Sequence, residues 1–143
     1  MTVVIVDASV GLKWLGLFAQ EQLVDRAKAL LDRKTAGQIT LMVPDLFWLE
    51  ISSALCKAVR RNKCTPEEAS QSLEEMQRLP VQTVPSTNLV NSAQEIAIQY
   101  GRSIYDSLYV ALARTTRSEL VTADEKLANA IAAYLPVKWL GAI

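Results

Sequence analysis

The fold is decided by the stretch Val3-Val4-Ile5-Val6-Asp7-Ala8-Ser9 near the start of the chain. Its four consecutive β-branched residues, without polar alternation, predict a strand that is buried on both faces, as in a parallel sheet covered by helices. Asp7 ends this run with a charge. An acid at the carboxyl end of a central parallel strand lies where open α/β sheets bind their ligands. Asp7 or Ser9 would equally cap a helix that begins near Val10, so this stretch alone leaves both interpretations open.

Length and composition indicate one globular domain over residues 1–143, because half of the residues are hydrophobic and the length suffices for a core. Fifteen basic residues balance fifteen acidic ones, which excludes a strongly basic nucleic-acid-binding surface but leaves room for a local basic patch. Histidine is absent. Its absence excludes serine and cysteine hydrolase triads, ribonuclease chemistry with paired histidines, and the usual zinc sites.

The location of the protein is predicted from its cysteines and its apolar segments. Cys56 and Cys64 lack the close spacing of a metal knuckle or a redox pair, which favours reduced thiols in a cytoplasmic protein. The N-terminal apolar run has no basic leader and is interrupted by Asp7, unlike a signal peptide. No stretch approaches the roughly 18 to 20 apolar residues of a membrane helix. We therefore expect a cytoplasmic protein without a membrane partner.

Predicted strands and helices alternate along the chain, which implies a parallel sheet with helices on both faces and right-handed crossovers. Thr65 and Glu68 form a capping-box pattern, Ser86 or Thr87 is expected to cap a further helix, and Gly101 to close it. After the first strand, strands are predicted at 39–43, 81–84, 120–122 and 137–140, and helices at 10–17, 20–36, 45–61, 65–79, 86–100, 103–114 and from 124 onward.

Four acids occupy the beginnings of helices or the ends of strands. Asp7 and Asp124 follow strands, Glu50 lies near the start of a helix that follows a strand, and Asp106 lies in the first turn of another helix. Because β-to-α junctions of a parallel sheet share one edge, Asp7, Glu50 and Asp124 are expected together, and Asp106 is compatible with that place. Each also has an ordinary explanation: Asp124 as a cap, Asp106 as a partner of the helix dipole, and Glu50 as a solvated residue.

Carboxylates gathered at one edge, with few cations near them in sequence, would protonate, pair with bases or bind a metal ion. All-oxygen ligands select Mg²⁺ or Mn²⁺ over zinc. An ion held in this way keeps several waters and commonly serves phosphate chemistry. The residues therefore predict a divalent-metal site for phosphoryl transfer or hydrolysis.

At this point the chain resembles a known family along essentially its whole length. Four segments in this order and spacing are similar to PIN-domain ribonucleases, above all to the VapC toxins of bacterial and archaeal toxin–antitoxin pairs. These segments are Val-Asp-Ala-Ser-Val at 6–10, Pro44 with Leu-Glu-Ile-Ser-Ser-Ala-Leu at 49–55, Tyr-Asp-Ser-Leu-Tyr-Val-Ala-Leu-Ala at 105–113 and Leu-Val-Thr-Ala-Asp-Glu-Lys-Leu at 120–127.

The resemblance implies a three-layer α/β/α sandwich with a central, mainly parallel sheet and an endoribonuclease activity that hydrolyses RNA phosphodiesters. Ser9 and Thr122 match supporting polar positions. Two departures concern neighbours of the acids: Ser107 stands where alanine is common, and Ser52-Ser53 where asparagine often lies. The implied catalytic and metal-binding residues, around Mg²⁺ or Mn²⁺, are Asp7, Glu50, Asp106 and Asp124.

The resemblance also implies an antitoxin, whose basic side chain would close the acidic pocket, and a homodimer, for which segments 10–17 and 20–36 offer surface. Tyr105 and Tyr109 are expected to be buried beside the sheet, with stacking on RNA bases as the alternative. Trp14, Trp48 and Trp139 are expected in the core or an interface. Candidates for positioning the RNA backbone, each otherwise a solvated residue, are Lys57, Arg60, Arg61, Lys63 and Arg102.

Two other aspartate-dependent classes are excluded by position. A haloacid-dehalogenase-type phosphatase needs a second aspartate where Ser9 stands, and a receiver domain needs an aspartate after its third strand and a lysine after its fifth. Two alternatives stay open: an RNA-processing PIN-like nuclease outside toxin–antitoxin systems, and a non-catalytic regulatory module that binds Mg²⁺. A metal-dependent cleavage assay on RNA and DNA separates the last from a nuclease.

Overall fold

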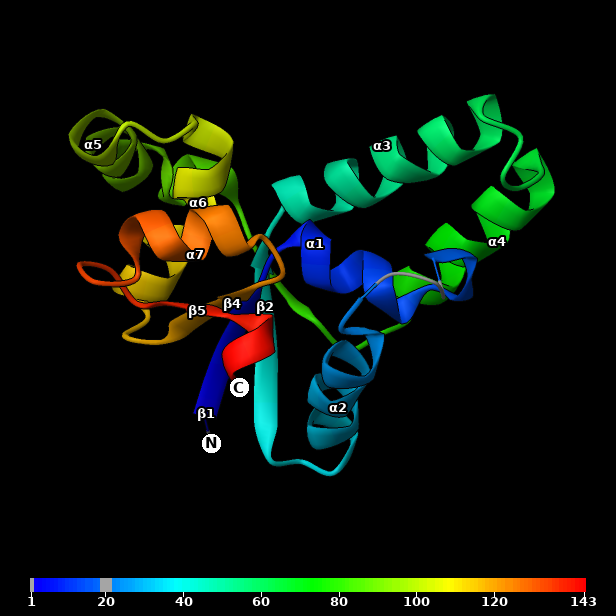
Figure 1. Cartoon of the computed structure of the whole chain (residues 1–143), viewed down its shortest axis with the longest axis horizontal. Helices are drawn as coiled ribbons and strands as arrows, with labels where there is room; N and C mark the ends of the chain where they lie inside the picture. The colour runs from blue at the N-terminus through cyan, green and yellow to red at the C-terminus, as the bar shows by residue number, and fades with distance from the viewer. Residues whose placement is uncertain (1, 19–21) are drawn as a thin grey trace.

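A five-stranded sheet in the order β3-β2-β1-β4-β5 forms the centre of the fold in the computed structural model, which describes residues 2–18 and 22–143 (Figure 1). All neighbouring strands pair in parallel, as predicted. The strands are β1 (Thr2–Val6), β2 (Ile39–Pro44), β3 (Gln82–Val84), β4 (Glu119–Thr122) and β5 (Val137–Trp139).

The direction in which the strands follow one another assigns the helices to the two faces. The chain moves outward from β1 to β3 on one side and from β4 to β5 on the other, so right-handed crossovers place the first four helices on one face and the last three on the other. Figure 1 shows these two groups. The helices are α1 (Ala8–Gly11), α2 (Val24–Thr35), α3 (Leu46–Arg60), α4 (Pro66–Gln77), α5 (Val90–Tyr100), α6 (Ile104–Thr115) and α7 (Glu125–Ile131). The predicted α/β/α sandwich is confirmed.

The predicted helix at 10–17 is wrong in detail. Helix α1 begins two residues earlier, because the Asp7 carboxylate accepts from the backbone N–H of Val10, and the chain continues in two 3₁₀ turns, Leu12–Trp14 and Gly16–Phe18. Gly11 lies so close to α3 that an added Cβ would approach the Phe47 ring to 2.6 Å. The start of the predicted helix 20–36 falls partly outside the described residues, and α2 begins at Val24.

The predicted caps are confirmed at two helices and wrong at one. The capping box of Thr65 and Glu68 is formed, and Gly101 ends α5 with a φ of 64°. Ser86 and Thr87 instead lie in a 3₁₀ turn, and α5 begins at Val90 without a side-chain cap. The Ser86 hydroxyl donates to the carboxylate of Asp45, which consequently does not cap α3.

The core lies on both faces of the sheet and fixes the ends of the strands. Helix α6 packs on β1, β2 and β4 and is covered by α5, whereas α1 packs on β1 and β4 on the other face. Helices α3 and α4 pack on each other and extend beyond the sheet (Figure 1). Within the described ranges, no helix is both long and apolar enough to cross a bilayer. Side chains with no more than 1 % exposure at the centre of the core include Ile5, Leu41, Phe47, Ile51, Leu112 and Leu120.

Candidate acidic metal site

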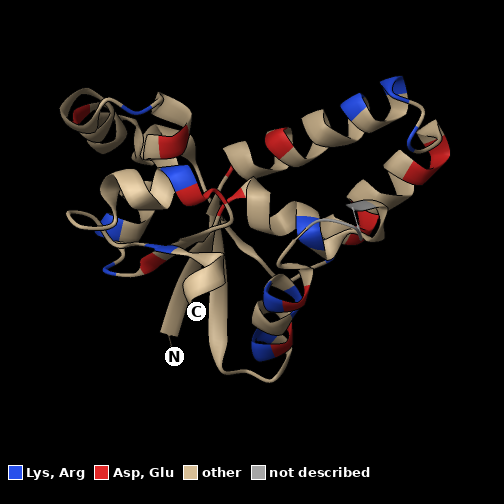
Figure 2. Cartoon of the chain, viewed as in Figure 1, with Lys and Arg blue, Asp and Glu red and all other residues tan. Residues whose placement is uncertain are grey.

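The carboxyl ends of β1 and β4 form the switch point of the sheet. Val6 pairs with Val121, and the chain leaves these two strands toward opposite faces. In open α/β sheets the crevice at such a point is the usual ligand site. Asp7 follows β1 directly and Asp124 follows β4 by two residues. Figure 2 shows acidic segments around this edge of the sheet.

Asp7 is the buried acid of this edge, with 8 % of its surface exposed. The Ser9 hydroxyl donates to Oδ1, and the Thr122 hydroxyl donates to Oδ2 over 2.5 Å. Burial raises the pKa of Asp7 to about 6, although these hydrogen bonds oppose the rise. The capping interpretation and the site interpretation therefore apply to the same carboxyl group.

Ser9 and Thr122 connect Asp7 to the loop between β4 and α7. The backbone N–H of Ala123 donates to the Ser9 oxygen over 2.9 Å, and that of Asp124 donates to the Thr122 oxygen over 3.1 Å. Each hydroxyl thus accepts from the loop and donates to Asp7. This is the geometry of the supporting role predicted for Ser9 and Thr122; that role in catalysis stays a prediction.

Glu50 is partly buried and bound to another element, so it is not a freely solvated helix residue. The Tyr109 hydroxyl donates to Oε1 of Glu50 over 2.5 Å. Burial raises the pKa of Glu50, the nearby charge of Asp106 adds to the rise, and the Tyr109 hydrogen bond opposes it. Burial and the Glu50 charge raise the pKa of Tyr109, which therefore stays protonated at neutral pH.

Tyr109 is the site residue whose contact is missing from the sequence-based expectations. Its predicted burial is confirmed at 3 % exposure, but its bond to Glu50 is not foreseeable from α6 alone. One feature of the sequence indicates that Tyr109 lies near the site. It follows Asp106 by three residues, which places the two side chains next to each other on one helix. Tyr105, by contrast, is 59 % exposed, so its predicted burial is wrong.

Asp106 and Asp124 combine their expected structural roles with a place at the same edge. Asp106 lies in the first turn of α6, where its N–H donates to Ser103 over 3.0 Å. Burial and then the charge of Asp124 raise the pKa of Asp106, against the opposing effects of Ser103 and Arg102. Asp124 is exposed and caps α7, accepting from the N–H of Leu127 over 3.1 Å.

The four acids form a continuous electrostatic series. Glu50 raises the pKa of Asp7, Asp106 raises that of Glu50, and Asp124 raises that of Asp106. The two ion pairs that described residues form with one another involve other acids, Glu95 and Glu119. The structure thus brings all four predicted acids to one edge.

The donor set at this edge fits a hard divalent ion that is held partly through water. Over residues 2–18 and 22–143, no three acidic or cysteine side chains lie close enough to hold one ion together. Mg²⁺ in proteins is commonly bound by only one or two carboxylates, with waters and substrate phosphate completing its shell. Oxygen ligands and a buried carboxylate held only by hydroxyl and amide groups suit Mg²⁺ or Mn²⁺ better than zinc.

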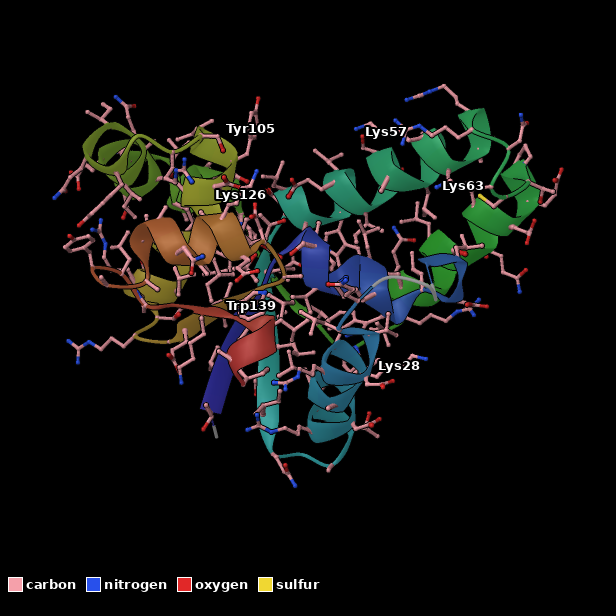
Figure 3. All side chains as sticks on the ribbon, viewed as in Figure 1. Lys28, Lys57, Lys63, Tyr105, Lys126 and Trp139 are labelled. Carbon is pink, nitrogen blue, oxygen red and sulfur yellow. The ribbon has the colours of Figure 1, made fainter. Side chains whose placement is uncertain are left out.

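The predicted RNA-binding residues fall into two places. Lys57, Arg60, Arg61 and Lys63 are exposed at the far end of α3 and just after it. Figure 3 labels Lys57 and Lys63 there. Arg60 lies ten positions after Glu50 on α3, about 15 Å along the helix at its usual rise per residue. Arg102 lies close enough to lower the pKa of Asp106. Lys126, not considered above, is exposed in the first turn of α7 (Figure 3).

The three tryptophans lie partly buried against the core. Trp14 donates to the Ala27 carbonyl over 2.8 Å, and Trp48 donates to the Thr83 hydroxyl over 3.0 Å. Cys56 and Cys64 are free thiols. These contacts agree with core or interface positions for the tryptophans and with reduced cysteines.

Comparison with known proteins identifies the family. Residues 4–132 match the PIN domain. The VapC ribonuclease Mb0985 of Mycobacterium bovis is 34 % identical over 113 residues, which cover 76 % of this chain and 87 % of that protein.

Two solved structures share the fold. PAE2754 from Pyrobaculum aerophilum superposes with a TM-score of 0.68 at 20 % identity, covering 99 % of this chain and 92 % of that one. A toxin–antitoxin complex from Klebsiella pneumoniae gives 0.65 at 15 % identity, covering 94 % and 95 %. The chain belongs to the PIN-domain family, and its relatives there are VapC ribonucleases, as the sequence motifs predict.

Proposed function

We propose that this protein is a VapC-type endoribonuclease that hydrolyses RNA phosphodiester bonds with a divalent ion at the acidic edge. The observation that carries the proposal is the Asp7 carboxylate, buried at the switch point, held by two hydroxyls and followed by three further acids in electrostatic contact. The ribonuclease relative from Mycobacterium bovis supports the choice of RNA as substrate.

Divalent-metal dependence is general in PIN-domain ribonucleases, and we propose Mg²⁺ or Mn²⁺ for this chain. Asp7, Asp106 and Asp124 would hold the ion directly or through water, with Glu50 as a further ligand or as the residue that orients water. When bound, such an ion activates water and neutralises charge on the phosphate oxygens.

The other side chains at the acidic edge hold the carboxylates in place. Ser9 and Thr122 fix both oxygens of Asp7, so that this carboxylate keeps one orientation. The Tyr109 hydroxyl donates to Oε1 of Glu50, the further ligand or water-orienting residue. Because the chain has no histidine, solvent or a second metal ion would assist the leaving oxygen.

Arg102, beside Asp106, is the best placed of the predicted basic residues to hold a phosphate next to the reacting one. The cluster at the end of α3 would contact the RNA backbone farther along. Such contacts position RNA without reading its sequence.

We propose further that the protein is the cytoplasmic toxin of a pair whose antitoxin inserts a basic side chain among the four acids. The negative charge of this edge, without an ion pair among the described residues, favours such a partner. A homodimer is also proposed. Among the described residues, none of the large exposed hydrophobic side chains lies in segments 10–17 or 20–36; they are Leu49, Val90, Ile98, Tyr105, Tyr134 and Ile143.

A cleavage assay on labelled single-stranded RNA and on DNA of the same sequence tests the nuclease proposal. We expect RNA cleavage with Mg²⁺ or Mn²⁺, none in excess chelator, and none by Asp7→Asn. Asp45→Asn is the matched control, since it removes an exposed aspartate bound by Ser86 and should leave cleavage intact. Circular dichroism establishes that both variants fold. Undiminished cleavage in chelator, or by folded Asp7→Asn, would contradict the proposal.

A further inference from the structure

The hydroxyl of Tyr109 connects helix α6 to helix α3. Its ring is buried on α6, and its O–H donates to Glu50 of α3. The O–O distance of 2.5 Å to Glu50 is at the short end for hydrogen bonds between a hydroxyl and a carboxylate.

A core tyrosine needs a partner for its hydroxyl, and a backbone carbonyl would serve. Here the donor is directed at a carboxylate that is itself partly buried and lies in the field of Asp106. Phenylalanine would fill the same space in the core. The hydroxyl is therefore explained by Glu50 rather than by packing.

Among the described side chains of this edge, Tyr109 is the one that donates to Glu50, whereas two side chains donate to Asp7. Without this bond, rotation about the Glu50 side chain would let its carboxylate turn away from the other acids. One donor therefore fixes the direction in which the second oxygen of Glu50 faces.

We infer that Tyr109 is a positioning residue of the acidic site, which holds Oε1 of Glu50 and thereby orients Oε2 toward the ion and the attacking water. The inference rests on the proposed function. Tyr109 makes no contact with the substrate in this scheme, so its removal should change the rate of the chemical step and leave RNA affinity unchanged.

The test compares wild type, Tyr109→Phe, Glu50→Ala and the double variant by two readouts. The first is the Mn²⁺ dissociation constant from calorimetry without RNA, and the second is kcat and KM for RNA at saturating Mn²⁺. Loss of a group that orients a ligand typically lowers metal affinity or activity by about 10- to 100-fold. We expect about tenfold weaker Mn²⁺ binding and about tenfold lower kcat for Tyr109→Phe, with KM within about twofold of wild type.

In the Glu50→Ala background, Tyr109→Phe should change neither quantity further, because the partner of the hydroxyl is gone. A merely structural role would predict the same factor in both backgrounds. Tyr100→Phe is the control: it removes a hydroxyl from a ring that packs on Tyr134, and should behave as wild type. Urea denaturation establishes that all the variants are folded under the assay conditions.

The outcomes separate this inference from the proposed function. Wild-type Mn²⁺ affinity and kcat in Tyr109→Phe, or equal losses in both backgrounds, would overturn the positioning role while leaving the nuclease in place. If the wild type binds Mn²⁺ but does not cleave RNA, the nuclease proposal fails and the Mn²⁺ constants alone decide the role of Tyr109. A wild type that binds no Mn²⁺ overturns both.

Discussion

The metal-free protein should become more stable at neutral pH when Asp7 is replaced by asparagine. Burial raises the pKa of Asp7 from 3.8 to about 6, so the folded state binds the proton more tightly than the unfolded state does. A group of this kind stabilises the fold fully below about pH 4. Its contribution to the free energy of unfolding is lost as the pH rises from the pKa of the unfolded state to the pKa of the folded state.

The size of the effect follows from that interval. One pKa unit corresponds to about 1.4 kcal/mol, so the ionised Asp7 lowers the free energy of unfolding by about 3 kcal/mol at pH 7 and by about 0.5 kcal/mol at pH 4. Asparagine does not ionise, so it makes no such pH-dependent contribution to the free energy of unfolding. Its amide also fits the site: Nδ2 can donate to Thr122, whose hydroxyl can turn to the Ser9 oxygen 3.4 Å away.

The assay is urea denaturation in excess chelator from pH 4 to pH 8, with Asp7→Asn and wild type measured in parallel. The difference between them should grow from about 0.5 kcal/mol at pH 4 to about 3 kcal/mol at pH 7 and above, in favour of the variant. Asp45→Asn is an informative control of opposite sign. Its bond from Ser86 lowers the pKa of Asp45, so removing that carboxylate should lower stability at pH 7, and the difference should fade toward low pH. If Asp7→Asn is less stable than wild type at pH 7, or parallel to it at every pH, the assignment of a costly buried carboxylate is refuted.

Three further predictions concern the ion and the partners. Asp106→Asn should melt at a higher temperature than wild type in chelator, since burial and Asp124 raise the pKa of Asp106. Mg²⁺ at ten times its dissociation constant should stabilise the wild type by about 1.4 kcal/mol, or about 3 to 6 °C, and the variant by less. Unchanged melting curves for both proteins would contradict a shared site. Removing the charge of the antitoxin's inserted basic residue should abolish inhibition in a cleavage assay, and inhibition that survives would exclude that contact. Light scattering at micromolar concentration should give a dimer, and a monomer would refute the dimer proposal.

The sheet and most of its site could be predicted because both follow from local patterns and topology. A run of β-branched residues marked β1 and an apolar run marked β2, and a parallel sheet brings the residues after its strands to one edge. Asp7 and Asp124 followed directly from that rule. Asp106 follows a helix, so its place depended on how α6 packs, which no local pattern contains.

The errors arose where distant groups compete for the same side chain. Ser86 has the sequence context of a cap, but it donates to Asp45 at the end of the neighbouring strand. Tyr105 and Tyr109 are four residues apart on α6, yet one is exposed and the other reaches Glu50. The bonds from Thr122 to Asp7 and from Ala123 to Ser9 likewise join residues more than a hundred positions apart.

The central claim is that the four acids form one divalent-ion site for RNA hydrolysis. Its most direct test is the Mn²⁺ dependence of the single-turnover cleavage rate for wild type and for the amide variants of Asp7, Glu50, Asp106 and Asp124. The account predicts saturable activation of the wild type by Mn²⁺, and a large loss of rate in every variant that stays folded. Cleavage that does not depend on Mn²⁺, or that survives unchanged in folded Asp7→Asn, would contradict it.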